Sequence, residues 1–126
     1  MSEYTNEKLL MRIHISEDDK YGHKPLFEAL IDLFNSKGYA GATVLKGVAG
    51  FGAWSGRRDG VPRARSHRLP LIVEVLSCRE RIDEIMPRIC GMMNSGMITL
   101  GTVKVAHYCA NIGRQEKLQE LKKMAH

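Results

Sequence analysis

The sequence has no long apolar run, no closely spaced pair of cysteines and few aromatic residues. No window approaches the ~18 apolar residues of a membrane span, and residues 1–8 are too polar for a signal peptide, so we expect a cytoplasmic protein. The three cysteines, Cys78, Cys90 and Cys109, are odd in number and far apart, which argues against a disulfide framework and a zinc site. We expect these thiols to be reduced and buried.

The positive charge of the chain is concentrated in one segment. At 126 residues and 44% hydrophobic content the chain has room for one domain, and its formal net charge is +5. Residues 50–69 hold five arginines against one aspartate, whereas residues 1–49 hold six basic against seven acidic side chains. A basic loop on a nearly neutral body indicates an anionic partner, such as a phosphate ligand, an acidic protein surface, a lipid headgroup or nucleic acid. The alternative is a solvated loop without a partner.

The first half of the chain predicts a strand, a helix and a second strand. Residues 8–16 alternate between an apolar face and a mixed face that carries Leu10 and His14. Pro25 suits the first turn of an amphipathic helix, and Gly38 suits its end. Residues 39–48 predict the second strand, which leads into the basic loop.

The second half predicts another strand, helix and strand. Residues 69–76 alternate as a strand, and Ser77 with Glu80 forms a capping box that opens a second helix. Pro87 removes one backbone hydrogen bond there, so we expect a kink rather than an end. Asn94 to Gly96 stops the helix, and residues 102–108 predict the last strand.

This β-α-β-β-α-β order predicts an α+β fold of the ferredoxin-like type. Two helices then cover one face of a four-stranded antiparallel sheet, with the first and third strands in its centre. The other face carries Leu10, Ile72 and Leu76, and its most economical cover is another copy of the same sheet. We assign residues 1–110 to one domain, with the basic loop at about 50–69, and residues 111–126 to a charged tail.

One glycine-rich motif resembles a known family. The chain reads Gly-x-x-Gly-Ala-Thr-Val-Leu-Lys-Gly-x-x-Gly-Phe-Gly from Gly38 to Gly52, with Leu69-Pro70, Pro87 and Gly96-Met-Ile-Thr-Leu100 further on. These positions resemble the PII-like family of uncharacterised domains (domain of unknown function 190), over residues 8–108. The resemblance implies a signalling homotrimer with its sheets facing inward and a T-loop-like protrusion. It also implies small ligands, often adenine nucleotides, at intersubunit clefts by the loop base, and a transporter or enzyme as partner of the loop.

Candidate ligand residues lie at the base of this loop and within it. Gly47, Gly50 and Gly52 can present successive backbone amides to an anion, with Lys46 beside them. The loop arginines that can fold over a phosphate are Arg57, Arg58, Arg65 and Arg68. The alternative for the glycines is a plain β-bulge or strand exit. Trp54 stacks on a partner or, as we favour, pins the loop to a neighbouring subunit.

Other functions receive less support. PII proteins carry a basic phosphate-binding turn before the last strand, but residues 94–101 here are uncharged, which removes one cradle for a triphosphate. An RNA-binding module is the alternative function, although Tyr108 is its one plausible aromatic on the sheet face. The histidines show no metal-binding spacing, and we expect His14 and His107 to be neighbours only if the first and last strands pair. No catalytic constellation emerges, so we expect a protein that is not an enzyme.

Overall fold

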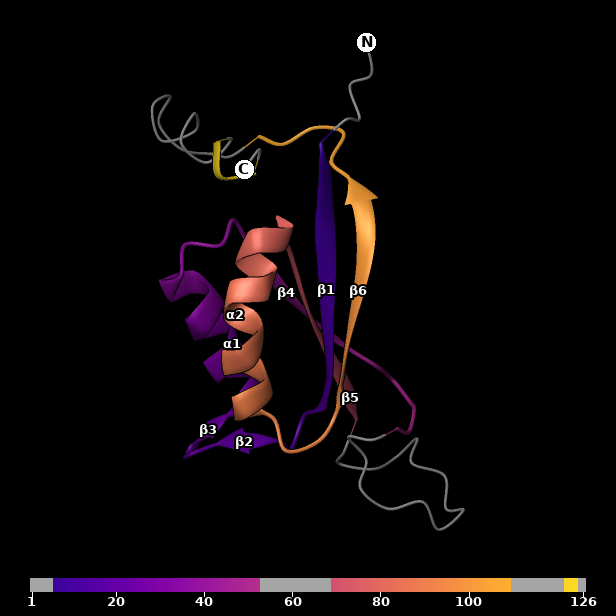
Figure 1. Cartoon of the computed structure of the whole chain (residues 1–126). Helices are drawn as coiled ribbons and strands as arrows, with labels where there is room; N and C mark the ends of the chain where they lie inside the picture. Colours follow the sequence, from indigo (N-terminus) through magenta and orange to yellow (C-terminus); the bar gives the residue numbers. More distant parts are fainter. Residues whose placement is uncertain (1–5, 53–68, 110–121, 125–126) are drawn as a thin grey trace.

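The structure, a computed structural model, describes residues 6–52, 69–109 and 122–124 and confirms an α+β fold (Figure 1). Its long strands form an antiparallel sheet in the order β4-β5-β1-β6. They are β1 (Glu7–Ser16), β4 (Ala42–Lys46), β5 (Pro70–Ser77) and β6 (Met97–Lys104). The helices α1 (Leu26–Ser36) and α2 (Arg79–Met92) lie on the same side of this sheet, as Figure 1 shows. The predicted central position of the first and third long strands is confirmed.

The core lies between the sheet and the two helices. Met11, Ile13 and Ile15 of β1 are fully buried because every second residue of a strand points to the same face. Leu30 and Phe34 of α1 and Ile82 and Ile89 of α2 are also buried in this cluster. The opposite face of the sheet carries Leu10, Ile72 and Leu76, which are only partly buried. The predicted two-sided apolar character of the central strands is therefore confirmed.

The end of α1 follows the predicted glycine stop. Gly38 has a φ of +75°, the left-handed region that glycine adopts without strain. The Gly38 amide donates to the Asn35 carbonyl at 3.1 Å, and the Tyr39 amide donates to the Phe34 carbonyl at 3.0 Å. This pair of bonds satisfies carbonyls that the helix end would otherwise leave open.

Two local predictions near the helix starts are wrong, and one short hairpin was not predicted. Ser77 does not cap α2, because it is the last residue of β5, and the N-cap is Cys78, which makes no side-chain capping bond. Pro25 is the N-cap residue of α1 rather than part of its first turn. Pro25 also ends a short hairpin, β2 (Lys20–Tyr21) with β3 (Lys24–Pro25), that the sequence analysis missed.

The last strand begins five residues before its predicted start at 102. Gly96 turns the chain directly after α2, and β6 then pairs with β1 from Met97 onward. His14 therefore lies opposite Met97, and His107 lies beyond the end of the strand, so the two histidines are not neighbours. The helix does continue through Pro87, as predicted. Of the cysteines, Cys78 is buried but Cys90 and Cys109 are exposed, which contradicts the expected burial of all three.

Candidate functional site

Hydrogen bonds and an ion pair join three strands at the end of the sheet where the basic loop begins and ends. The Glu17 amide donates to the Leu69 carbonyl at 3.0 Å, and the Gly47 amide donates to the Pro70 carbonyl at 2.8 Å. The Lys46 ammonium forms an ion pair with the Glu17 carboxylate, with Nζ and Oε2 at 2.8 Å. We call Glu17, Lys46, Gly47, Leu69 and Pro70 the loop base. The base is built from the ends of β1, β4 and β5, so the rigid sheet holds both ends of the loop in place (Figure 1).

Gly47 has a structural role that the sequence motif did not reveal. A Cβ atom at this position would lie 2.6 Å from the Pro70 Cγ atom, so only glycine fits without a shift of the proline ring. The Gly47 amide is used in the bond to Pro70, and it therefore continues the β4–β5 pairing. Because the Gly47 amide already donates to Pro70, the predicted run of anion-binding amides loses Gly47 and is limited to the segment of Gly50 and Gly52.

Gly96 brings a second turn against the same end of β1. Its φ is +128°, and an added Cβ would lie 2.4 Å from the backbone oxygen of His14. The turn of residues 94–96 thus packs directly on the backbone of β1, two residues before Ser16. The three residues of this turn, Asn94, Ser95 and Gly96, carry no charge.

The ion pair at the loop base is exposed enough to be exchanged. The Lys46 side chain is 57% exposed and the Glu17 side chain 23% exposed. Exposed pairs contribute only about 0–1 kcal/mol because water competes for both charges. Lys46 is therefore the more accessible partner of this ion pair. The predicted loop residues Arg57, Arg58, Arg65, Arg68 and Trp54 lie outside the described residues.

Two exposed apolar residues beside the loop base were not singled out from the sequence. Val48 is 89% exposed and Phe51 is 72% exposed, directly after β4. Val48 follows Gly47, and Phe51 lies between Gly50 and Gly52, so neither belongs to an alternating or helical apolar pattern in the sequence. These two exposed apolar side chains are candidate contact residues for a partner.

The open face of the sheet combines apolar side chains with one charged pair. Leu10 lies opposite Leu76, and Arg12 lies opposite Glu74, whose carboxylate Oε2 accepts from the Arg12 Nε at 2.7 Å. Burial lowers the pKa of the neighbouring His14, and the positive charge of Arg12 lowers it further. The charges of Arg12 and Glu74 thus offset each other on this face, and the Arg12 side chain remains 49% exposed.

The far end of this face meets the C-terminal part of the chain. A cavity of about 340 Å³ is lined by Leu10, Leu76, Tyr108 and Met124 among others, and Met124 is buried. Tyr108 therefore lies beside the apolar end of the open face, away from the loop base. Within the described ranges, no group of three or more His, Cys, Asp or Glu side chains could hold a metal ion. No helix in this part of the chain is long and apolar enough to cross a membrane.

Comparisons with known proteins agree with the resemblance seen in the sequence. Residues 8–105 match the model of domain of unknown function 190, described as "Uncharacterized ACR". A UPF0166 protein of Aquifex aeolicus is 35% identical over 102 residues, which cover 80% of this chain and 95% of that protein. A UPF0166 protein of Methanocaldococcus jannaschii is 27% identical over 92 residues, which cover 72% of this chain and 84% of that protein.

A solved structure also aligns with the chain. The structure of CPII bound to ADP and bicarbonate, from Thiomonas intermedia K12, gives a TM-score of 0.47 and 14% sequence identity over 80% of this chain and 90% of that one.

Proposed function

This chain belongs to the family of domain of unknown function 190, and we propose that it is a PII-like regulatory protein. In this proposal it assembles as a homotrimer, binds a small anionic ligand at the loop base and acts on a protein partner through its basic loop. The observation that carries the proposal is the position of the charge. Five arginines lie in a segment that leaves and re-enters the fold at one point, where β1, β4 and β5 are cross-linked by hydrogen bonds.

The ligand is proposed to be a phosphate-bearing molecule, with an adenine nucleotide as the leading candidate. Lys46 can exchange Glu17 for a phosphate oxygen, and the loop arginines offer forked donors that suit phosphate geometry. The uncharged turn of residues 94–96 offers no cation for further phosphates. ADP or AMP therefore fits this base better than ATP.

The trimer is proposed from the open face of the sheet. The helices α1 and α2 lie on the other side, and Tyr108 and Met124 approach Leu10 and Leu76 at one end of the open face. Another copy of the sheet is the proposed cover for the rest of this face. An unpaired carboxylate in such an interface costs several kcal/mol, so Ile72→Asp should produce monomers in a sedimentation experiment. His23→Asp adds the same carboxylate on an exposed hairpin turn and should leave the trimer intact. A wild-type monomer at micromolar concentration would contradict this part of the proposal.

The ligand proposal is tested by thermal unfolding with AMP, ADP, ATP and inorganic phosphate. A ligand at about 100 times its dissociation constant stabilises the folded state by about 2.7 kcal/mol, which raises the melting temperature measurably. The shift should disappear when Arg57, Arg58 and Arg65 are replaced together by alanine, while the unliganded melting temperature is kept. The matched control replaces the exposed body residues Arg79, Arg88 and Lys104, which removes the same charge. Equal loss of the shift in both variants would mean that only net charge matters.

We also propose that the chain works by binding and not as an enzyme. The described charged side chains of the loop base, Glu17 and Lys46, pair with each other in a partly exposed ion pair, which suits the binding of a charged ligand. The RNA-binding alternative gains nothing from the described sheet face. Its four strands carry no aromatic side chain there, and Tyr108 lies beyond the end of β6.

A further inference from the structure

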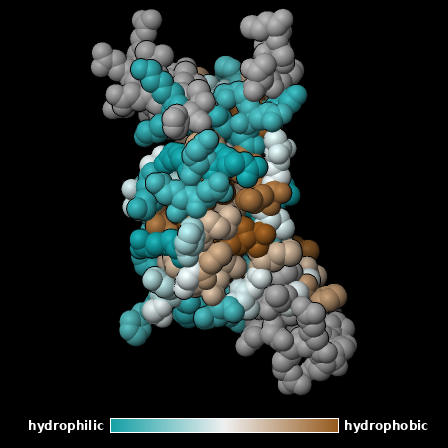
Figure 2. Space-filling view, viewed as in Figure 1, coloured by the Kyte–Doolittle hydropathy of each residue, from teal (hydrophilic) through white to brown (hydrophobic). Residues whose placement is uncertain are grey.

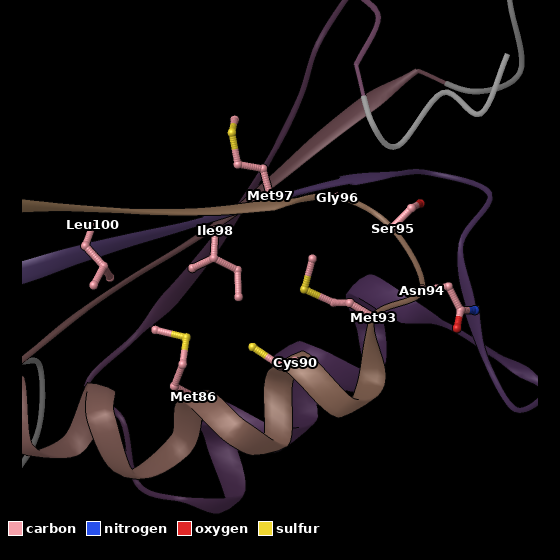
Figure 3. A pocket seen from close by; sticks show the side chains of 9 residues that line it. All are labelled: Met86, Cys90, Met93, Asn94, Ser95, Gly96, Met97, Ile98 and Leu100. Atoms are coloured by element: carbon pink, nitrogen blue, oxygen red, sulfur yellow. The ribbon is translucent and has the colours of Figure 1, made fainter.

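A sulfur-rich pocket lies between α2 and the edge strand β6. Its volume is about 430 Å³, and three of its lining residues, Met86, Cys90 and Met93, come from the end of α2 or the residue that follows it. Figure 3 shows their side chains extending from the helix toward Ile98 and Leu100 of β6, whereas Met97 turns to the other side of the strand. Figure 2 shows hydrophobic surface over β6 and beside α2.

The three sulfurs share one face because of their spacing. Cys90 follows Met86 by four residues and precedes Met93 by three, and residues three or four apart are neighbours on a helix surface. The buried residues of α2 form a different stripe, Ile82, Ile85, Ile89 and Met92, and Met86 and Met93 pack against the edge of the same core. Met86 and Met93 are only partly buried and Cys90 is exposed, so this second stripe is accessible from solvent. We call Met86, Cys90 and Met93 the sulfur row.

The chemistry of the lining selects one class of ligand. The described residues that line the pocket supply thioethers and a thiol, with Asn94 and Ser95 as polar side chains, and none of them is a histidine or a carboxylate. Hard and borderline cations such as Mg²⁺ or Zn²⁺ therefore find no suitable ligand set, whereas thiolate and thioether sulfurs favour soft ions. We infer that the sulfur row binds a soft monovalent metal ion of the Cu(I) class, with Cys90 as the anionic ligand and Met86 and Met93 as neutral ones.

When the metal ion binds at the sulfur row, it replaces the proton of the Cys90 thiol, and neither the metal nor the sulfur changes oxidation state. The Cys90 thiol loses its proton as the sulfur–metal bond forms, and the proton goes to solvent. The two thioether sulfurs donate lone pairs and lose nothing. Ag(I) has the same charge and softness and is not oxidised in air, so it can replace Cu(I) as a probe. This inference does not depend on the proposed anion site, because it uses none of the residues of the loop base.

Two titrations of the full chain test this inference. In the first, the protein competes with a coloured chelator for Cu(I) in the absence of oxygen. In the second, Ag(I) is titrated into the protein and the heat of binding is measured by calorimetry. The wild type should bind one ion at the sulfur row. Loss of an outer-shell partner typically weakens metal binding by about 10–100-fold, so loss of the direct ligand in Cys90→Ala should weaken binding by at least about 100-fold. The double variant Met86→Leu with Met93→Leu keeps the apolar volume and should also weaken it.

Two controls separate the sulfur row from unspecific thiol binding. Cys109→Ser removes another exposed thiol, and Met92→Leu removes a core thioether beside the row; both should bind the ion as the wild type does. If the Met86 and Met93 double variant binds unchanged, the cysteine acts alone and the inference is wrong. It is equally wrong if Cys109→Ser, rather than Cys90→Ala, abolishes binding. Circular dichroism of each variant checks that the fold is retained.

Discussion

Replacing Gly96 by alanine should destabilise the protein strongly, because two independent constraints act on this residue. Its φ of +128° is a conformation that side chains rarely adopt, and such strain costs about 1–3 kcal/mol. In addition, the new Cβ would lie 2.4 Å from the His14 backbone oxygen, and a backbone atom of a central strand cannot move aside easily. We therefore expect a loss of about 3 kcal/mol, which corresponds to a decrease of about 10 °C in melting temperature for a domain of this size.

The matched control for this substitution is Gly91→Ala. Gly91 is exposed in α2, and nothing lies within 4 Å of an added Cβ, so alanine should stabilise the helix by up to about 1 kcal/mol. Melting temperatures of both variants are compared at one protein concentration, because assembly makes the value concentration-dependent. A Gly96→Ala protein that melts within 2 °C, on the order of measurement error, of the wild type would refute the close packing of this turn on β1.

Two further predictions concern titratable side chains. Burial raises the pKa of Tyr39 to about 12, and its hydroxyl donates to the Arg81 carbonyl at 2.9 Å. Tyr39→Phe should remove the group that titrates near pH 12 in an ultraviolet titration, and an unchanged titration would contradict the burial. The same substitution should lower the free energy of unfolding in urea by about 1 kcal/mol, because it removes the hydrogen bond. Burial and then Arg12 lower the pKa of His14, so protonation favours the unfolded chain, and stability should fall as the pH decreases from about 7 to 5. His14→Gln should flatten this dependence, and a steeper decrease than in the wild type would show the opposite sign.

The regular elements were predictable where burial imposes a simple period on the sequence. β1 alternates because one face covers the core, and α1 shows helical spacing because one stripe does, so both could be located closely. Gly38 and Pro87 were also interpreted correctly, since a helix stop and an interior proline depend on local backbone chemistry. The family followed from the glycine motif and is confirmed.

The errors arose where contacts distant in sequence decide the structure. Residues 97–101 show no clear alternation, and their pairing with β1 makes them a strand. The short hairpin of β2 and β3 is too brief to leave a pattern, and Ser77 stays in β5 because its partner Leu9 extends the ladder that far. The contact of Lys46 with Glu17 likewise joins strands that only the folded sheet brings together.

Amide hydrogen exchange of the full chain with and without ADP, and with and without inorganic phosphate, tests the anion site most directly. A ligand held at the loop base should slow exchange in peptides that cover residue 17 and residues 46–52, where the Glu17 and Gly47 amides of the base lie. Peptides that cover α1 should be unaffected, because this helix contributes none of the residues of the loop base. Protection at the loop base with either ligand is the result that we predict. Protection elsewhere without any change at residues 46–52, or no change with both ligands, would contradict the account.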